Sequence, residues 1–509
     1  MVSEYSDEIK KDIELIERYQ KEMTLLGQAS ALLHWDNSTY MPKNAALGRA
    51  EQLAFLRSLV HEKMTSLEFS ESVFRLLERK DELSSRDRLM VEKLSKNIGK
   101  AGKLSKEFVE RLSKTCSMSF DAWQKAREKK DWEIFRPHLE KVVELKREEA
   151  RLYGFSGSLY NGLMDDFEEG MSVEKIRPVF EKLKVGLIEL LSRIESSDRY
   201  REQEEESGGG IKEKEFPHAM QIEMAKEMAV SLGLSEDYGR LDISEHPFST
   251  HIGQGDLRIT TNVRDDPFFS IGSTIHETGH SLYEYGLPDD ECYNVLGQAA
   301  SYGLHESQSR FWELMVGMSE EFWRHFFPKF DEKFGLDGRF DDWFRELNMV
   351  KKSPIRIESD EVHYCLHIIM RFEIAVGLID GAIEVRDLRE VWNSKMMEYF
   401  GIEVKDDKEG VLQDVHWSEG YFGYFPSYAI GTIYASQLYS KMVEELSGIK
   451  DEISEGRFER VRDWLCDRVH CHGSKKLADD IVKNVCGKGL DVDAFLGYLN
   501  GKYGELYGF

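Results

Sequence analysis

Proline is scarce in this chain, and that scarcity limits the folds that it can adopt. Only 10 of the 509 residues are proline, while long stretches are rich in Glu, Lys and Leu. Proline interrupts helices, whereas these three residues are good helix formers. The sequence therefore predicts a mainly α-helical protein. The helical pattern is nearly continuous over residues 1–200 and returns from about residue 290 to the end.

Two segments depart from the helical pattern. Residues 199–218 are charged and contain three consecutive glycines, which predicts a flexible segment. Residues 246–263 consist of short β-branched runs with Gly turns, which predicts a small β-ribbon. Since there are no repeats and no clean linker, we expect a single domain over residues 1–509. Its helical N-terminal lobe should span about 1–200, and its functional motifs about 215–509.

Composition excludes several classes of function. The formal charge is −26, from 94 acidic and 68 basic residues. This argues against binding to nucleic acids or to an anionic membrane surface. The six cysteines show no disulfide-like framework, the first residues form a charged amphipathic pattern rather than a signal peptide, and no run of eighteen apolar residues occurs. We therefore expect a cytoplasmic protein with no membrane span.

Two histidines and a glutamate form the pattern H-E-x-x-H within STIHETGHSLYEYG (273–286). The chain has 15 histidines in 509 residues. The pattern should arise by chance somewhere in such a chain with a probability of roughly a few per cent. Its context must therefore decide between a metal site and a buried helix whose histidines have ordinary partners.

That context favours an amphipathic helix. Asp266 and Pro267 suit an N-cap and a first helical position, and Gly286 followed by Pro288 suits a C-terminus. Between these ends, apolar or small residues recur at spacings of three and four: Phe268, Ile271, Ile275, Gly279 and Leu282. A glycine inside a helix costs about 1 kcal/mol. Gly279 therefore predicts that another segment approaches the helix closely.

The histidines of the motif are placed to share a metal ion. His276 and His280 lie one turn apart on one face of the predicted helix. Two imidazoles so placed can bind one zinc ion at about 2.0–2.1 Å. Glu277 is adjacent to His276 and can reach a water molecule at the metal rather than the metal itself. The sequence thus predicts a catalytic zinc site with Glu277 as general base.

A catalytic zinc site needs a third protein ligand. Metzincins place a histidine six residues after the second, where this chain has Gly286. Glu284 lies about 6 Å further along the same helix axis and is poorly placed, and Cys292 would be unusual in a hydrolase. Glu306 is the best candidate, with Arg310 four residues later to orient it. Its alternative is a surface Glu–Arg pair, which the spacing alone leaves equally open.

Together these residues resemble those of the carboxypeptidase Taq family, also called thermostable carboxypeptidase 1, which are HExxH zinc metallocarboxypeptidases. The resemblance spans nearly the whole chain, with motifs in order and no departure at a motif position. The matching segments are ALLHWDNSTYMPKNAALGRAEQLA (31–54), HPF (246–248), DLRIT (256–260), HESQSR (305–310), IRIESD (355–360), GVLQDVHW (410–417), GYFGYFPSYAIG (420–431) and the C-terminal FLGYLNGKYGELYGF. It implies a mainly helical, zincin-like fold with a long, deep groove, a homodimer, and Glu306 as the third metal ligand.

Two further groups of residues are candidates for roles in catalysis. The oxyanion formed during hydrolysis needs hydrogen-bond donors, for which Tyr424 and His416 are candidates. Their alternative is packing in an aromatic core. A carboxypeptidase also needs a group that binds the terminal carboxylate, and Arg356 is the candidate because a guanidinium matches a carboxylate bidentately. Its alternative is an ion pair with Glu358 or Asp360.

Other motif residues are weaker candidates for substrate contact. His246 of HPF, Arg258 of DLRIT and Gln413 of GVLQDVHW are assigned to substrate binding. HPF and DLRIT are expected to form a β-ribbon on the groove edge, where an extended peptide could add as a strand. For Asp256, Arg258 and Thr260 a structural role is favoured. A separate cluster, Cys466, His470, Cys471 and His472, lacks a matching downstream pair and is interpreted as structural.

These patterns predict a metal-dependent carboxypeptidase of broad specificity that acts on peptides. We expect one divalent ion per chain, with zinc as the first choice and cobalt as the alternative, since both accept such N/O sites. One alternative is a related HExxH endo-oligopeptidase, which does not require the carboxylate anchor Arg356. The other is a catalytically inactive peptide-binding protein, against which the intact set His276, Glu277, His280 and Glu306 argues.

Overall fold

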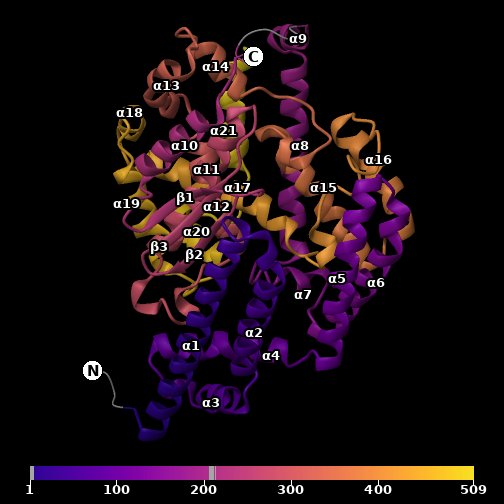
Figure 1. Ribbon diagram of the computed structural model, residues 1–509, viewed down its shortest axis with the longest axis vertical. Coiled ribbons are helices and arrows are strands. Elements are labelled where there is room, and N and C mark those ends of the chain that lie inside the picture. The colour runs from indigo at the N-terminus through magenta and orange to yellow at the C-terminus, as the bar shows by residue number, and fades with distance from the viewer. Residues whose placement is uncertain (1–4, 206–210, 212–213) are drawn as a thin grey trace.

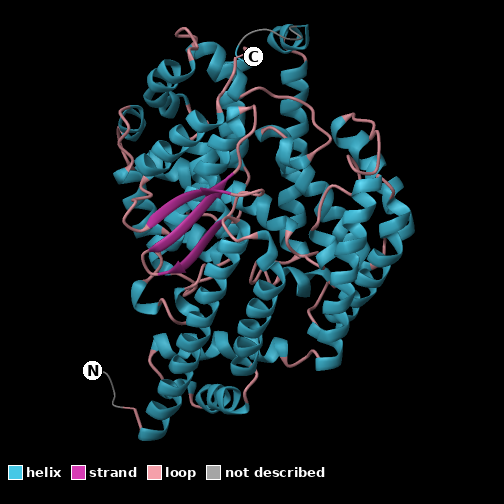
Figure 2. Cartoon of the chain, in the orientation of Figure 1, coloured by secondary structure: helices cyan, strands magenta, loops and turns pink. Residues whose placement is uncertain are grey.

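The computed structural model describes residues 5–205, 211 and 214–509. Helices dominate these residues, and the one small sheet found among them lies on one side of the molecule (Figure 2). The expected fold class, mainly helical with a small β element beside the HExxH helix, is confirmed. The predicted flexible segment at 199–218 is only partly described: α9 covers Asp198–Glu205, and the three glycines lie outside the described residues.

The helices before the sheet are α1 (Asp7–Ser38), α2 (Ala46–Met64), α3 (Leu67–Glu78), α4 (Ser85–Ala101), α5 (Lys106–Lys129), α6 (Trp132–Tyr153), α7 (Tyr160–Met164), α8 (Val173–Glu195), α9 (Asp198–Glu205) and α10 (His218–Leu232). The sheet consists of β1 (Gly239–Ile243), β2 (Ser249–Gly253) and β3 (Asp256–Thr261).

After the sheet follow α11 (Pro267–Gly286), α12 (Tyr302–Arg310), the π-helical turn η6 (Phe311–Val316), α13 (Glu320–Phe334), α14 (Phe340–Leu347), α15 (Glu361–Asp380), α16 (Leu388–Phe400), α17 (Phe425–Glu445), α18 (Ile449–Ser454), α19 (Glu459–Arg468), α20 (Ala478–Cys486) and α21 (Asp493–Tyr507). Short 3₁₀ turns include η7 (Arg356–Glu358), η9 (His416–Glu419) and η10 (His470–His472).

The sheet differs from the expected ribbon by one strand. Strands β2 and β3 form the predicted antiparallel pair, with Ser249 opposite Ile259. Strand β1 adds parallel to β3, giving the order β1-β3-β2. This third strand was not predicted because a parallel partner leaves no hairpin signal in the sequence. The segment 246–248, expected within the ribbon, belongs to the connection between β1 and β2.

Helix α11 has the predicted ends. The Asp266 side chain caps it by accepting a hydrogen bond from the Phe268 N–H at 2.9 Å, and Pro267 is its first residue. The helix ends at Gly286. Most of its apolar stripe is buried, including Ile271 and Ile275, and Phe268 is partly buried. Both ends of α11 could therefore be predicted from local sequence signals.

Glycines allow α12 to pack tightly between α11 and α17 (Figure 1). A Cβ added at Gly279 of α11 would lie 2.6 Å from the Gln308 carbonyl oxygen and 2.7 Å from the Ser309 Cα. On the other side, a Cβ at Gly431 of α17 would lie 2.7 Å from the Glu306 Cγ. The predicted close approach at Gly279 is confirmed, and the approaching segment is the helix that carries Glu306.

Most of the buried apolar side chains form one cluster, which extends from Trp123 to Tyr507. Helices α5–α8 thus share a core with the second half of the chain. A smaller cluster, from Ile9 to Leu94, joins α1, α3 and α4, and Leu296 belongs to it. Helix α15 is apolar and long enough to cross a membrane, but 89% of its apolar window is buried inside the protein, as expected for a core helix.

The glycine packing yields a test on two positions of the same helix. Gly279→Ala should destabilise the protein, because overpacking against backbone atoms costs typically about 1–3 kcal/mol and outweighs the gain in helix propensity of about 1 kcal/mol. Gly272→Ala is the matched control, since nothing lies within 4 Å of its added Cβ. The control should be neutral or slightly stabilised. Urea unfolding of the metal-free proteins measures both, and equal stability of the two variants would contradict the packing argument.

Candidate active site

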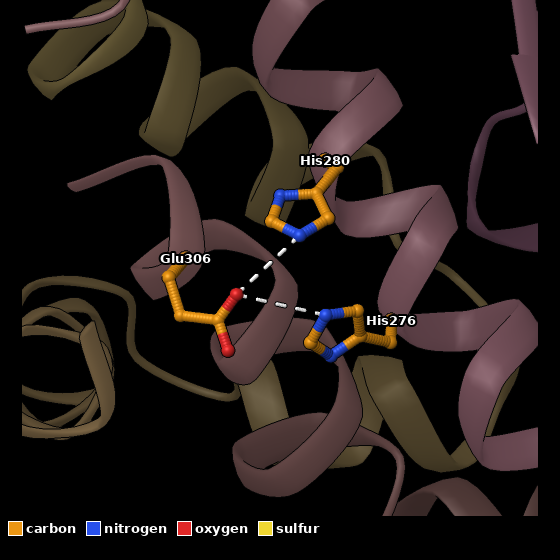
Figure 3. A group of neighbouring side chains, drawn as sticks. All are labelled: His276, His280 and Glu306. Carbon is orange, nitrogen blue, oxygen red and sulfur yellow. Dashed lines mark ion pairs between the residues drawn. The ribbon is translucent and has the colours of Figure 1, made fainter. Parts of the chain in front are cut away.

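Two helices bring His276, His280 and Glu306 to one point (Figure 3). Helix α11 supplies both histidines, and α12 supplies the glutamate. One carboxylate oxygen, Glu306 Oε2, lies 3.6 Å from His276 Nε2 and 3.5 Å from His280 Nε2. The candidate ligand atoms of the three residues all lie within 4.8 Å of one another.

The two separations to Glu306 and the chemistry of these atoms suit a tetrahedral metal ion. Ligand atoms held at 2.0–2.1 Å from zinc stand roughly 3.3 Å apart at the corners of a tetrahedron. The observed separations of 3.5 and 3.6 Å are close to that value and long for hydrogen bonds. Burial lowers the pKa of His280 to about 3, and the nearby His305 contributes. The neutral ring is the form that binds metal.

The side chain of Glu306 is fixed by Arg310. Arg310 Nε donates to Glu306 Oε1 at 2.9 Å, which leaves Oε2 facing the histidines. Burial would raise the pKa of Glu306, but the charges of His276 and Arg310 outweigh it and hold this pKa below the usual range. Glu306 is 7% exposed, so the alternative of a surface Glu–Arg pair is wrong.

Glu313 orients the first histidine. Its Oε2 lies 2.8 Å from His276 Nδ1 and 3.1 Å from Arg310 Nη1. A carboxylate on the second ring nitrogen of a ligand histidine fixes the direction of the nitrogen that binds the metal. Glu313 belongs to the π-helical turn η6, and such turns occur frequently at functional sites.

Glu277 lies beside the metal site. Its side chain is buried, and burial raises its pKa to about 7, while His276 and the Ser249 hydroxyl of β2 oppose the rise. A carboxylate in this range can accept and return a proton near neutral pH. The proximity of Ser249 also places the edge strand β2 next to Glu277.

Arg356 is buried, and its partner is Asp414. Arg356 Nε donates to Asp414 Oδ1 at 3.0 Å, and Nη1 donates to the Tyr364 hydroxyl at 3.3 Å. The expected alternative, a pair with Glu358 or Asp360, is wrong: Asp360 caps α15 and pairs with His363. The Arg310 guanidinium lies over the Tyr364 ring at 4.3 Å, which links Arg356 to Glu306.

Gln413 holds the Arg356 segment through its side-chain amide. Its Oε1 accepts from the Arg356 N–H at 3.1 Å and from Arg371 Nη2 at 2.7 Å. Its Nε2 donates to the carbonyls of Pro354 and Glu409. These four hydrogen bonds tie Gln413 to the Arg356 segment and its neighbours, so Gln413 positions Arg356, and a direct contact with substrate stays a prediction.

The structure brings Tyr424 and His416 together. Their rings stack with centroids 5.5 Å apart, and both contact Tyr428, whose hydroxyl lies 3.3 Å from His416 Nε2. Burial, with the charges of Tyr428 and Glu306, raises the pKa of Tyr424, so its hydroxyl keeps its proton and can donate. Arg356 lies over the Tyr428 ring at 5.1 Å. The expected aromatic packing is present, and a role for Tyr424 or His416 at the oxyanion stays a prediction.

His246 and Arg258 differ in their surroundings. His246 is exposed in the loop between β1 and β2, where its carbonyl accepts from the Ser244 hydroxyl at 2.6 Å. Arg258 makes two bonds of 2.8 Å to Asp256 and lies over the Trp35 ring at 4.2 Å. The structural role favoured for Arg258 therefore matches its contacts, and substrate contact by either residue stays a prediction.

The remaining candidates lie outside the metal cluster. Glu284 binds His305 at 3.0 Å and His251 at 3.3 Å. His470, from the Cys/His segment, is buried and lies 3.0 Å from Gln308 Oε1. Across the part of the chain that is described, His276, His280 and Glu306 form the group of His, Cys, Asp or Glu residues able to hold a metal.

Several residues of the site were missed from the sequence: Glu313, His305, Asp414 and Tyr428. For Glu313 a signal existed, because positions 306, 310 and 313 follow the spacing of one helical face. For Asp414 the sequence held only its place in a motif. Its contact with Arg356 joins segments 58 residues apart, which no local pattern predicts.

A helical fold with an HExxH helix and a glutamate on a second helix defines a metallopeptidase site of the two-His, one-Glu type. The chain belongs to the carboxypeptidase Taq (M32) metallopeptidase family, whose model matches residues 15–503. This confirms the resemblance indicated by the motifs, and the activity class is that of a metallocarboxypeptidase.

The chain is similar to known carboxypeptidases over nearly its full length and theirs. The chain is 37% identical to thermostable carboxypeptidase 1 of Thermus thermophilus, covering 96% of this chain and 98% of the relative. It is 36% identical to carboxypeptidase 1 of Bacillus subtilis, covering 96% and 97%. The crystal structure of the M32 carboxypeptidase from Deinococcus radiodurans is similar with a TM-score of 0.93 and 32% identity, covering 98% of this chain and 100% of that chain.

Glu306 is a proposed metal ligand, whereas Glu313 only orients one. Substitution of the two residues should therefore weaken metal binding to different degrees. Glu306→Ala removes a ligand and should reduce Zn²⁺ binding most. Glu313→Ala removes only the partner of His276 and should weaken binding about 10–100-fold, as is typical for partners of ligand histidines. Competition with a chromophoric chelator measures both, with Glu320→Ala on α13 as an unaffected control. Full metal occupancy in Glu306→Ala at wild-type affinity would show that the third ligand is another residue.

Proposed function

We propose that this chain releases C-terminal amino acids from peptides at one divalent ion held by His276, His280 and Glu306. The observation that carries the proposal is the convergence of two imidazole nitrogens and one carboxylate oxygen, with Arg310 occupying the other oxygen. Zinc is the ion that this N/O set suits, and cobalt can replace it. When bound, such an ion polarises the scissile carbonyl and lowers the pKa of water.

Glu277 acts as the general base in this proposal. Its carboxylate takes a proton from the attacking water and delivers it to the leaving amine. Its burial beside His276 and its raised pKa support this role. Tyr424 and His416 are the proposed donors to the oxyanion. The protonated hydroxyl of Tyr424 and its proximity to Glu306 support the first of these.

Arg356 is the proposed anchor for the terminal carboxylate. Asp414 engages its Nε, so the two terminal nitrogens form the remaining fork. Nη1 has a single bond of 3.3 Å, to Tyr364, and Nη2 has no hydrogen-bond partner within the described residues. This arrangement supports bidentate binding of a carboxylate. It favours a carboxypeptidase over an endo-oligopeptidase, which needs no such anchor.

The contacts described above concern catalysis and do not bear on four other properties expected from the sequence. Broad specificity, a deep substrate groove, a homodimeric assembly and a cytoplasmic location stay predictions. The described residues do enclose a cavity of about 970 Å³ between α1, α2, the sheet and the end of α11. Its wall includes His251 and Glu284 but none of the three proposed metal ligands.

The role of Glu277 predicts a separation of binding from catalysis. Glu277→Gln should bind metal and peptide as the wild type does but lose proton transfer, lowering kcat by roughly 10²–10⁴-fold. Metal content, peptide affinity and hydrolysis are measured on the same preparation. Wild-type protein stripped with a chelator is the companion sample, and it should be inactive until metal is restored. A Glu277→Gln variant with wild-type kcat would exclude Glu277 as the base.

The role of Arg356 predicts selectivity for a free C-terminus. Leaving one partner of a buried charge pair without the other typically costs about 2–5 kcal/mol, which is roughly a 30- to several-thousand-fold loss of kcat/KM. Amidation of the peptide should cause a similar loss in the wild type, because it removes the same interaction. Arg356→Ala should then discriminate little between acid and amide peptides, since the two changes are not additive.

The measurement uses product ladders of one peptide in acid and amide forms, on wild type, Arg356→Ala and Arg258→Ala. Arg258→Ala is the matched control, because Arg258 is already paired with Asp256 and should not affect selectivity. Loss of selectivity in Arg258→Ala alone would move the anchor to that residue. Internal cleavage of the amide at undiminished rate by the wild type would favour the endo-oligopeptidase.

A further inference from the structure

The two proposed ligand histidines are held in different ways. A ligand histidine usually donates its second ring N–H to a carboxylate, carbonyl or water, which fixes the plane of the ring. His276 follows this rule through Glu313, at 2.8 Å. His280 does not: its Nδ1 is buried and has no hydrogen-bond partner in the described part of the chain. No protein group in the described residues therefore fixes the plane of His280 through a hydrogen bond, and its ring contacts become the candidates for that role.

Within the part of the chain that is described, His280 has two ring contacts, an edge contact with His276 at 4.8 Å and a face-to-face contact with His305. The rings of His280 and His305 stack with centroids 4.3 Å apart and an interplanar angle of 21°. His305 directly precedes the proposed ligand Glu306 on α12, so both residues reach the site from the same turn. A parallel ring at this distance restricts rotation of the imidazole about its side-chain torsions.

His305 is in turn held by a chain of contacts that leads to the sheet. Its Nε2 lies 3.0 Å from Glu284 Oε1, one turn beyond His280 on α11. The other oxygen of Glu284 lies 3.3 Å from His251 Nδ1 on the edge strand β2. One carboxylate therefore bridges two histidines, and this bridge forms part of the wall of the 970 Å³ cavity.

We propose that His305 is the positioning residue of His280. Its stacked ring, clamped by Glu284 and tied to β2 through His251, takes the place of the hydrogen bond that orients His276. The inference rests on the proposed metal site and extends it by naming what aligns the second ligand. Loss of the ring should weaken metal binding by about 10–100-fold, the range found for partners that orient metal ligands.

Three substitutions at one position separate the ring face from the bulk of the side chain and from its bond to Glu284. His305→Ala removes the ring, His305→Leu keeps bulk without a flat face, and His305→Phe keeps a stacking face but loses the bond to Glu284. The matched control is His325→Ala, a half-buried histidine on α13 whose ring contacts Phe326 at 4.6 Å. Helix α13 supplies no residue of the proposed metal site.

The readouts are the dissociation constant for Co²⁺ added alone to the metal-free protein and the visible absorption spectrum of the bound ion, which reports ligand geometry. We expect His305→Ala and His305→Leu to bind Co²⁺ about 10–100-fold more weakly with an altered spectrum. His305→Phe and His325→Ala should stay within a few-fold of wild type and keep its spectrum. If His305→Ala does not fold, the comparison of Leu with Phe decides.

Wild-type affinity and spectrum in His305→Leu would overturn the positioning role. So would a loss in His305→Phe as large as that in His305→Leu, because the ring face would then not matter. Absence of Co²⁺ binding by the wild type would instead overturn the proposed metal site, and the inference with it. The wild-type titration thus distinguishes failure of the function from failure of the positioning role.

Discussion

The close approach of α11, α12 and α17 is the constraint on which the active site depends. Glu306 can reach the two histidines only because no side chain separates α12 from its neighbours at Gly279 and Gly431. On both sides the space that a Cβ would occupy is already filled by α12, by backbone atoms at Gly279 and by the Glu306 side chain itself at Gly431. Protein interiors yield little to such overpacking. The geometry of the candidate metal site is therefore set by helix packing before any ion binds.

Ion pairs then fix the orientation of the side chains that helix packing brings together. Arg310 holds one oxygen of Glu306 and also contacts Glu313, which orients His276. On the far side of Tyr364, Asp414 holds Arg356. Each buried charge named here has a partner of opposite sign, as burial requires. The proposed metal ligands and the proposed carboxylate anchor thus belong to one connected network, which fixes the position of Arg356 relative to Glu306.

Much of this arrangement could be predicted from the sequence, and the limits have physical causes. The ends of α11, the facing histidines and the close contact at Gly279 follow from local spacing and glycine chemistry. Strand β1 could not be predicted because its pairing with β3 is parallel and leaves no turn signal. The partner of Arg356 was mistaken because local acidic residues were considered, whereas Asp414 is distant in the chain. The stacking of His305 on His280 depends on the packing of two helices, which no single-helix pattern reveals.

The central claim is that His276, His280 and Glu306 hold one catalytic metal ion. An anomalous difference map from crystals of the protein loaded with Zn²⁺, measured on both sides of the zinc absorption edge, tests it most directly. The account predicts one strong peak per chain, within about 2.0–2.2 Å of His276 Nε2, His280 Nε2 and Glu306 Oε2. A peak bound by Glu284 in place of Glu306, or one in the segment of His470 and Cys471 with none between α11 and α12, would contradict it.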